Sequence, residues 1–280
     1  MPTQRILADS SCDLTPDYLA SSGVELEIIP FYIHTDEREF CDTPDLDVDA
    51  MMEYLSTSGA QAQSACPSPE TYYQAMMKSD ISWVVTISSG LSGSYNSACI
   101  ARDMAQEQGK TVYVIDSKAT GGVQVLIIDA LAKMIGQGLA PDEIYRRILT
   151  FTDNRKLLFV LRNFDNLIRN GRMLKIVAKV ITALNICPIC AKSEQGTIEI
   201  REKIVGIKKT FRRLIALLGE NIRDFAGADV IINHCQAPQD AEALKTQIQS
   251  TFPSIGNVRI IPTRGLASFY AQRNGLIVSF

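Results

Sequence analysis

A run of serines and glycines in the first half of the chain combines residue types that bind anions. The apolar stretch 83–87 before the run predicts a buried strand, and the small residues Ala98 and Ala101 after it predict a helix. Such a turn gathers backbone N–H groups at the positive end of the helix dipole, and its glycines let a ligand approach closely. The run therefore predicts a site for a carboxylate or phosphate, although serines in such turns also serve as plain helix caps. Its residues are Ile87, Ser88, Ser89, Gly90, Leu91, Ser92, Gly93, Ser94, Tyr95, Asn96, Ser97 and Ala98.

Two other polar segments also follow apolar stretches. Residues 9–13 follow the apolar stretch 6–8, and residues 116–118 follow 111–115. Strands that alternate with helices predict a parallel sheet in a doubly wound α/β domain, where ligands bind outside the carboxyl ends of the strands. We therefore expect these two segments and residues 88–94 to meet at one edge of the sheet.

Turn residues and apolar patterns place the remaining elements. The expected further helices are 15–23, 47–55, 68–78, 121–134, 208–218 and 240–252, and the expected further strands are 24–33, 159–161, 196–200, 229–232, 258–261 and 276–280. Residues 151–213 hold fourteen Lys and Arg against five Asp and Glu. This change of character, together with the polar stretch 152–155, predicts an N-terminal α/β domain over 1–153 and a basic C-terminal α/β domain over 154–280.

Composition excludes several classes of protein. The chain of 280 residues is 46% hydrophobic and carries a net charge of −3, which disfavours a dedicated nucleic-acid binder. It has no apolar run long enough to span a bilayer and no signal peptide, so we expect a soluble cytoplasmic protein. The seven cysteines are odd in number and scattered, which favours reduced thiols. Cys187 and Cys190 form a CxxC pair without a second pair at zinc spacing, so we interpret them as ordinary thiols and expect no metal.

Motifs for catalysis are weak in this sequence. It contains neither GxGxxG nor a P-loop, and the glycine after Ser92 stands in the wrong place for a GxSxG nucleophile elbow. The two histidines, His34 and His234, lie at the ends of predicted strands and are interpreted as structural or surface residues. An anion site without a nucleophile–base pair favours a binding protein over an enzyme.

Taken together, the polar segments resemble the DegV family, bacterial fatty-acid-binding proteins that serve as partner subunits of fatty acid kinase. The resemblance implies a two-domain DegV-like α/β fold. Its N-terminal domain is a three-layer α/β/α unit with a parallel sheet, and its C-terminal domain is α/β. The matching segments occur in the family's order and span nearly the whole chain; they are 9–14, 64–69, 87–98, 114–118 and 167–172.

The resemblance also implies a function. A long-chain fatty acid lies in an apolar tunnel, and a hydroxyl network holds its carboxylate. A separate fatty acid kinase catalytic subunit phosphorylates this carboxylate to an acyl phosphate, so the chain itself is non-catalytic and needs no cofactor other than its ligand. Partners expected on this basis are the fatty acid and the kinase, with transient membrane contact and no nucleic acid.

Individual residues follow from the matched motifs. The hydroxyls expected at the carboxylate are Ser64, Ser92, Ser89 and Ser94. In the second domain, Gly171 and Arg172 match the family's glycine-arginine motif, and Lys208 and Lys209 lie near the segment implicated in kinase docking. A buried carboxylate needs such partners because leaving it unpaired is very unfavourable. Apolar residues that suit either a core or a tunnel are Phe31, Met51, Met52, Met76, Met77, Ile100, Leu126, Ile127, Leu158, Phe164 and Leu167.

The tail of the chain departs from the family pattern, which has a histidine before Gly-Pro-Gly. If Gly275 is the last glycine of that motif, Ala271 occupies the histidine position. Tyr270, Gln272 or Arg273 are then the candidates to replace it. The departure leaves two other interpretations open, a binding or sensor protein for a different amphiphile and a free-standing serine hydrolase.

Overall fold

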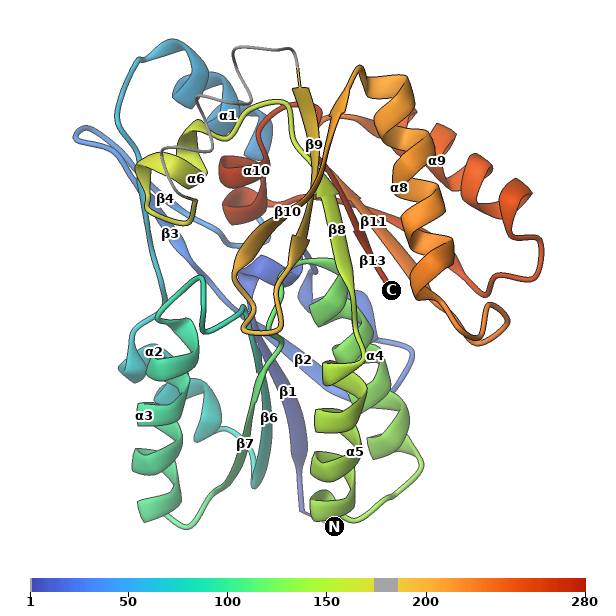
Figure 1. Ribbon diagram of the computed structural model, residues 1–280. Coiled ribbons are helices and arrows are strands. Elements are labelled where there is room, and N and C mark those ends of the chain that lie inside the picture. The colour runs from blue at the N-terminus through green and yellow to red at the C-terminus, as the bar shows by residue number, and fades with distance from the viewer. Residues whose placement is uncertain (1, 174–185) are drawn as a thin grey trace.

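The computed structural model describes residues 2–173 and 186–280, which form a mixed α/β molecule (Figure 1). Its strands in this part of the chain belong to a four-stranded, a six-stranded and a three-stranded sheet. In Figure 1 the four-stranded sheet occupies the lower half and the six-stranded sheet the upper half of the molecule. The expected fold, a parallel sheet followed by a second α/β unit, is confirmed, whereas the domain boundary after residue 153 stays a prediction.

The four-stranded sheet is entirely parallel. Its strands, in order, are β2 (Glu25–Ile29), β1 (Gln4–Asp9), β6 (Ile81–Thr86) and β7 (Thr111–Asp116). Because side chains alternate along a strand, each strand contributes apolar residues to both faces. Leu7 and Val84 pack in one cluster and Ile6, Trp83 and Val85 in another, which gives the sheet two separate cores.

Helices cover both faces of this sheet, giving the expected three layers (Figure 1). One face carries α2 (Pro69–Met76) and α3 (Ser94–Glu107), and the other carries α4 (Gly122–Gly136) and α5 (Pro141–Asp153). Helix α3 turns the small residues Ala98, Ala101 and Ala105 into the core, at the spacing of one helix face. Small residues let α3 approach the sheet closely, which fixes the loop that leads into it.

The six-stranded sheet is mostly antiparallel, with a single parallel pair, β11 and β12, among its described strands. Helices α8 (Ile207–Asn221) and α9 (Pro238–Thr251) pack against this sheet. Together they form a core that is separate from the two cores of the four-stranded sheet. Its strands, in order, are β10 (Ile198–Val205), β9 (Ile186–Lys192), β8 (Leu157–Val160), β13 (Leu276–Ser279), β11 (Val230–His234) and β12 (Val258–Pro262).

Helix α4 joins the two large sheets. Its first residue, Gly122, lies so close to β11 and β13 that an added Cβ would stand 2.6 Å from the Cβ of Ile231 and 2.8 Å from that of Ser279. The N–H group of Gly122 donates to Asn233 Oδ1 at 2.9 Å. One helix therefore packs on both halves and holds their facing surfaces at a fixed distance.

The smaller elements lie beside the six-stranded sheet, in the upper left of Figure 1. The three-stranded sheet has the order β4 (Glu39–Cys41), β3 (Tyr32–His34) and β5 (Gln63–Ala65), and the remaining short helices are α1 (Val48–Thr57), α6 (Asp165–Arg169) and α10 (Gly265–Ala271). Both carboxylate oxygens of Asp42 accept hydrogen bonds from α10, one from the N–H of Gly265 at 2.8 Å and one from that of Leu266 at 2.9 Å. The N-terminal half thus anchors a helix of the C-terminal half.

Two of the expected elements differ in the structure. The segment 15–23 forms only a short 3-10 helix, Pro16–Leu19, and not a longer α-helix. The expected strand 24–33 is interrupted around Pro30, which has no N–H group to donate to a sheet, so that β2 and β3 belong to different sheets. Helices α5, α6 and α10 and strands β4, β5 and β9 were not expected.

Candidate functional site

A buried carboxylate organises the edge at which β1, β6 and β7 end. Asp9 accepts hydrogen bonds from Ser11 Oγ at 2.6 Å, from Ser94 Oγ at 2.7 Å, from the N–H of Ile87 at 2.8 Å and from Gln124 Nε2 at 3.0 Å. Burial raises the pKa of Asp9, while these hydrogen bonds act to lower it. The polar segments after β1 and β6 therefore meet as expected, with Asp9 as their common acceptor.

Two of the expected ligand hydroxyls are engaged in this edge. Ser94 is buried, donates to Asp9 and lies 2.7 Å from the hydroxyl of Tyr72. Ser89 is exposed and donates through Oγ to Asp116 Oδ2 at 2.6 Å, which joins the ends of β6 and β7. Neither serine lines the apolar cavity that lies beside this edge. Their hydroxyls thus hold the loop, and a contact of either with a ligand stays a prediction.

Backbone N–H groups of the serine loop are also largely used within the protein. They donate to acceptors that lie in the same loop or on Asp116. The groups concerned are the N–H groups of Ser89, Gly90, Leu91, Ser92 and Ser94. The expectation that free N–H groups bind the anion is thus wrong for these five residues, because the tight turn satisfies its own donors.

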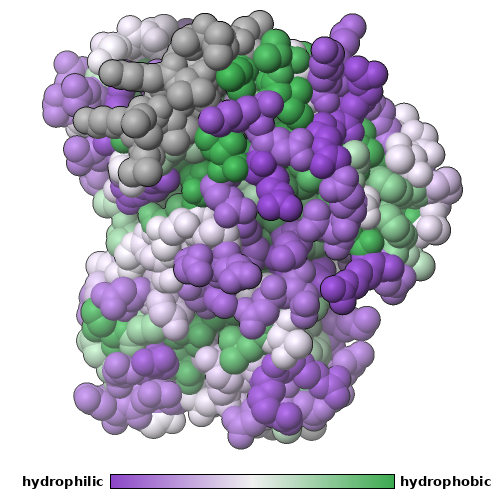
Figure 2. All heavy atoms as spheres, in the orientation of Figure 1, coloured by the Kyte–Doolittle hydropathy of each residue, from purple (hydrophilic) through white to green (hydrophobic). Residues whose placement is uncertain are grey.

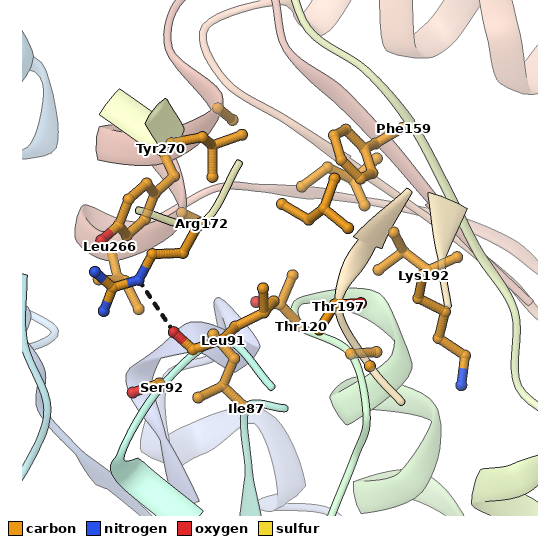
Figure 3. A pocket seen from close by; sticks show the side chains of 18 of the residues that line it. Ile87, Leu91, Ser92, Thr120, Phe159, Arg172, Lys192, Thr197, Leu266 and Tyr270 are labelled. Atoms are coloured by element: carbon orange, nitrogen blue, oxygen red, sulfur yellow. Dashed lines mark hydrogen bonds between the residues drawn. The ribbon is translucent and has the colours of Figure 1, made fainter. Parts of the chain in front are cut away.

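An apolar cavity lies between the serine loop and the six-stranded sheet (Figure 3). Strands β8 and β13 supply apolar wall residues such as Leu157, Phe159 and Ile277, and the serine loop supplies Ile87 and Leu91. Polar side chains gather at one end of it, where Figure 3 shows Ser92, Arg172 and Tyr270 on the same side. That end is lined by Ser64, Ser92, Arg172 and Tyr270.

The polar end is held together by side-chain contacts from distant parts of the chain. Ser64 Oγ and the hydroxyl of Tyr270 lie 2.7 Å apart. Arg172 donates from Nε to the carbonyl of Leu91 at 3.1 Å and also to the carbonyl of Asn170. Burial raises the pKa of Tyr270, and the Ser64 hydrogen bond and the Arg172 charge oppose this shift. Among the described residues, this end thus combines neutral hydroxyls with the cation Arg172.

The residues proposed to replace the family histidine separate in space. Tyr270 and Ala271 line the cavity, but Gln272 and Arg273 do not. Arg273 forms an ion pair at 2.9 Å with Glu53 on the surface. Of these four residues, Tyr270 is the one that brings a polar group into the cavity.

Other expected site residues lie elsewhere. Gly171 is exposed in a turn with φ 74°, directly before Arg172. Lys208 and Lys209 are exposed in the first turn of α8, and part of the basic segment 151–213 lies outside the described residues. Cys187 and Cys190 are buried on β9, and no cluster of metal-ligating residues occurs within 2–173 and 186–280. Of the apolar candidates, Phe31 and Leu167 line the cavity and the others do not.

Three polar side chains of the cavity wall were not anticipated from the sequence. Thr120 and Thr197 line the middle of the cavity and Lys192 its side away from Ser92 (Figure 3). Thr120 stands directly before the two glycines that open α4. This position at the start of a predicted helix could have identified Thr120 from the sequence as a candidate site residue. Thr197 and Lys192 flank the turn between β9 and β10, and nothing in their local sequence points to a cavity.

Comparison with known proteins decides the family. A family model described as "Uncharacterised protein, DegV family" matches residues 3–271. The chain belongs to the DegV family. A DegV domain-containing protein of Streptococcus gordonii is 36% identical over 281 residues, which cover 99% of both chains.

Solved DegV structures share the whole fold. A DegV family protein of Eubacterium eligens loaded with heptadecanoic acid is 34% identical, with a TM-score of 0.91 over 99% of this chain and 98% of that chain. The Streptococcus pneumoniae fatty acid kinase (Fak) B3 protein loaded with linoleic acid is also 34% identical, with a TM-score of 0.91 over 99% of both chains. Among the described helices, none has the length and apolar character needed to cross a membrane.

Proposed function

We propose that this DegV protein binds a long-chain fatty acid in the apolar cavity and presents its carboxylate to a separate fatty acid kinase. The observation that carries the proposal is the shape of the site, an apolar cavity that ends in Ser64, Ser92, Arg172 and Tyr270. Apolar walls suit an acyl chain, whose burial contributes about 0.8 kcal/mol per methylene. The two DegV structures with bound fatty acids support the same ligand class.

The head group would lie among the side chains of the polar end. A carboxylate there receives hydrogen bonds from the hydroxyls of Ser92, Ser64 and Tyr270, because hydroxyls that bond one another also turn toward a stronger acceptor. Arg172 adds a positive charge at short range, and its guanidinium donates to the carbonyls of Leu91 and Asn170.

A non-catalytic role fits the residues at the cavity. Neither histidine lines it, since His34 pairs with Glu39 at 3.0 Å and His234 Nδ1 accepts the N–H of Ala237 at 3.3 Å. Its serines therefore have no imidazole base beside them in the described residues. The phosphoryl donor and the catalytic groups would come from the kinase, and the fatty acid would be the only small molecule that this chain carries.

We further propose that the C-terminal half contributes the kinase contact. Lys208 and Lys209 are exposed at the start of α8, where they suit an acidic partner surface. The functional division would follow the predicted domains, with residues 1–153 supplying the serine loop and 154–280 supplying Arg172, Tyr270 and most of the apolar wall. Reversing the charge of both lysines is expected to slow ligand transfer to the kinase without changing fatty acid affinity.

Mass spectrometry of the organic extract of freshly purified protein tests the proposal. A fatty acid in stoichiometric amount supports it, and acyl phosphate formed only when protein, kinase and ATP are together supports the presentation step. An extract with a different amphiphile would favour the sensor interpretation. No ligand, together with an unchanged melting temperature on adding fatty acids, would overturn the proposal, and turnover of an acyl ester by the chain alone would revive the hydrolase.

A further inference from the structure

Two cavities of opposite character meet inside this molecule. The apolar cavity is one, and the other is a polar groove between α5, β9 and β10. Three residues line both, namely Leu157, Ala191 and Lys192. Leu157 and Ala191 are buried and short, so the side chain of Lys192 is the longest part of the shared wall.

Lys192 lies at the side of the apolar cavity away from the polar end. In Figure 3 the stem of Lys192 lies to the right of Phe159 and Thr197, whereas Ser92 and Arg172 lie on the left. The amine of Lys192 points away from the cavity. A lysine can cover apolar surface with its methylene stem while its charged head stays in a polar environment. The position of Lys192 at the end of β9 allows this arrangement, because the strand ends where the groove begins.

Charged side chains of both signs line the polar groove beside Lys192. Lys118 and Lys156 line it, and the ion pair of Lys118 with Asp153 has a length of 2.7 Å. Glu199 and Arg201 line its other side from β10. Hydrophilic side chains cover much of the middle of the face in Figure 2, where the two halves meet. Polar and charged side chains make up most of the groove lining, with Leu157, Leu158, Leu217 and Phe280 as its larger apolar members. An acyl chain that entered the groove would therefore find less apolar contact there than in the apolar cavity.

We propose that the stem of Lys192 forms the distal wall of the acyl cavity and sets the longest acyl chain that the protein binds. The inference rests on the proposed function, because it assigns a specificity residue to the same cavity. A chain that is too long must push Lys192 aside or expose methylene groups to the groove. One methylene more or less in an apolar pocket changes the preference between two ligands about 10- to 200-fold. A wall formed by Lys192 therefore produces a sharp limit on acyl chain length.

Two substitutions separate the stem from its charge. Lys192→Met keeps a long unbranched stem without the ammonium, whereas Lys192→Ala removes the stem and opens the cavity into the groove. Lys156→Ala is the matched control, since Lys156 lines the groove but not the apolar cavity. The measurement is the affinity of delipidated protein for a series of saturated fatty acids of increasing length, added singly.

Wild type, Lys192→Met and Lys156→Ala are expected to share one length limit. Lys192→Ala is expected to bind acids beyond that limit. The affinity of Lys192→Ala for these longer acids, relative to its affinity for the acid that wild type binds best, is expected to rise at least about tenfold. An unchanged limit in Lys192→Ala, in protein that still binds fatty acids, would overturn this inference and leave the proposed function standing. A wild type that binds no fatty acid of any length would instead overturn the proposed function, and the inference with it.

Discussion

Ser64 Oγ and the hydroxyl of Tyr270 lie 2.7 Å apart and connect β5 with α10 across the polar end of the cavity. If Gly275 is the last glycine of the family motif, Ala271 stands at the family's histidine position, and it brings only a methyl group to the cavity wall. Tyr270, one residue earlier, supplies a hydroxyl instead. Asp42 anchors the start of α10 and so fixes where that hydroxyl lies.

Removing the Tyr270 hydroxyl should weaken fatty acid binding without disturbing the fold. Tyr270→Phe keeps the ring against Phe269 and loses one hydrogen bond to the ligand carboxylate, and a hydrogen bond to a charged group contributes about 1.5–3 kcal/mol. We expect an affinity loss of about tenfold or more, measured by titration with a fluorescent fatty acid. Tyr113→Phe is the control, because that hydroxyl donates to Asp142 at 2.8 Å far from the lining residues.

A double-mutant cycle separates a joint role from two independent ones. Ser64→Ala combined with Tyr270→Phe should weaken binding by less than the product of the single effects, because the two hydroxyls act as one unit. Effects that multiply would show that Ser64 and Tyr270 contribute separately.

Two neighbouring serines provide a matched test of the serine loop. Ser92→Ala should lower fatty acid affinity about tenfold or more, because hydrogen bonds to a charged group contribute about 1.5–3 kcal/mol. Ser89→Ala should leave affinity within about twofold, because Ser89 is exposed, bonded to Asp116 and absent from the cavity wall. Calorimetric titration of both variants decides this. Equal losses in the two would show that the loop acts through its conformation and not through Ser92.

The edge of the parallel sheet could be predicted because local sequence determines it. Residues 9–13 and 88–94 follow apolar strands directly, and in a parallel sheet such strand ends must lie together. Which serine faces the ligand could not be predicted. Ser92 and Ser94 are two positions apart, yet the turn into α3 directs one toward the cavity and buries the other against Asp9.

Elements outside this sheet depend on contacts between distant residues. Helix α10 is a short helix that is buried on nearly all sides, and its first two N–H groups donate to Asp42, more than two hundred positions away. Its local sequence therefore predicts little. Helix α5 is different, because Pro141 at its start, the early acids Asp142 and Glu143 and the buried Ile144 and Ile148 follow ordinary helix patterns. It could have been found from the sequence.

The contact of α4 with the six-stranded sheet gives a prediction on stability. Gly122→Ala would place a Cβ 2.6 Å from that of Ile231, and overpacking of this kind lowers the free energy of unfolding by about 1–3 kcal/mol. Gly136→Ala in the same helix meets nothing within 4 Å and should raise that free energy by up to about 1 kcal/mol. Urea unfolding of both variants measures the difference. A Gly122→Ala protein as stable as wild type would mean that α4 is free to move away from β11.

The charge of Lys192 predicts how stability depends on pH. Burial, together with the nearby charges of Lys156 and Lys118, lowers the pKa of Lys192 from the ordinary value of 10.5 to about 8, and Asp153 and Asp116 oppose this shift. Between these two pH values the unfolded chain binds more protons than the folded chain, so this residue makes stability rise with pH. Below pH 8 Lys192 is charged in both states and disfavours the folded one. Lys192→Met should therefore raise the melting temperature at pH 7, and the gain should shrink as pH rises from 8 to 10.5.

Thermal unfolding of wild type and Lys192→Met at several pH values between 7 and 10.5 measures this gain. Lys133→Met, an exposed position on α4, controls for the loss of a positive charge in general. A gain that stays constant over the whole range would mean that Met improves packing and that the ammonium of Lys192 is fully solvated. A gain that disappears near pH 10.5 would show that folding desolvates this amine, as expected for a side chain whose stem separates an apolar cavity from a polar groove.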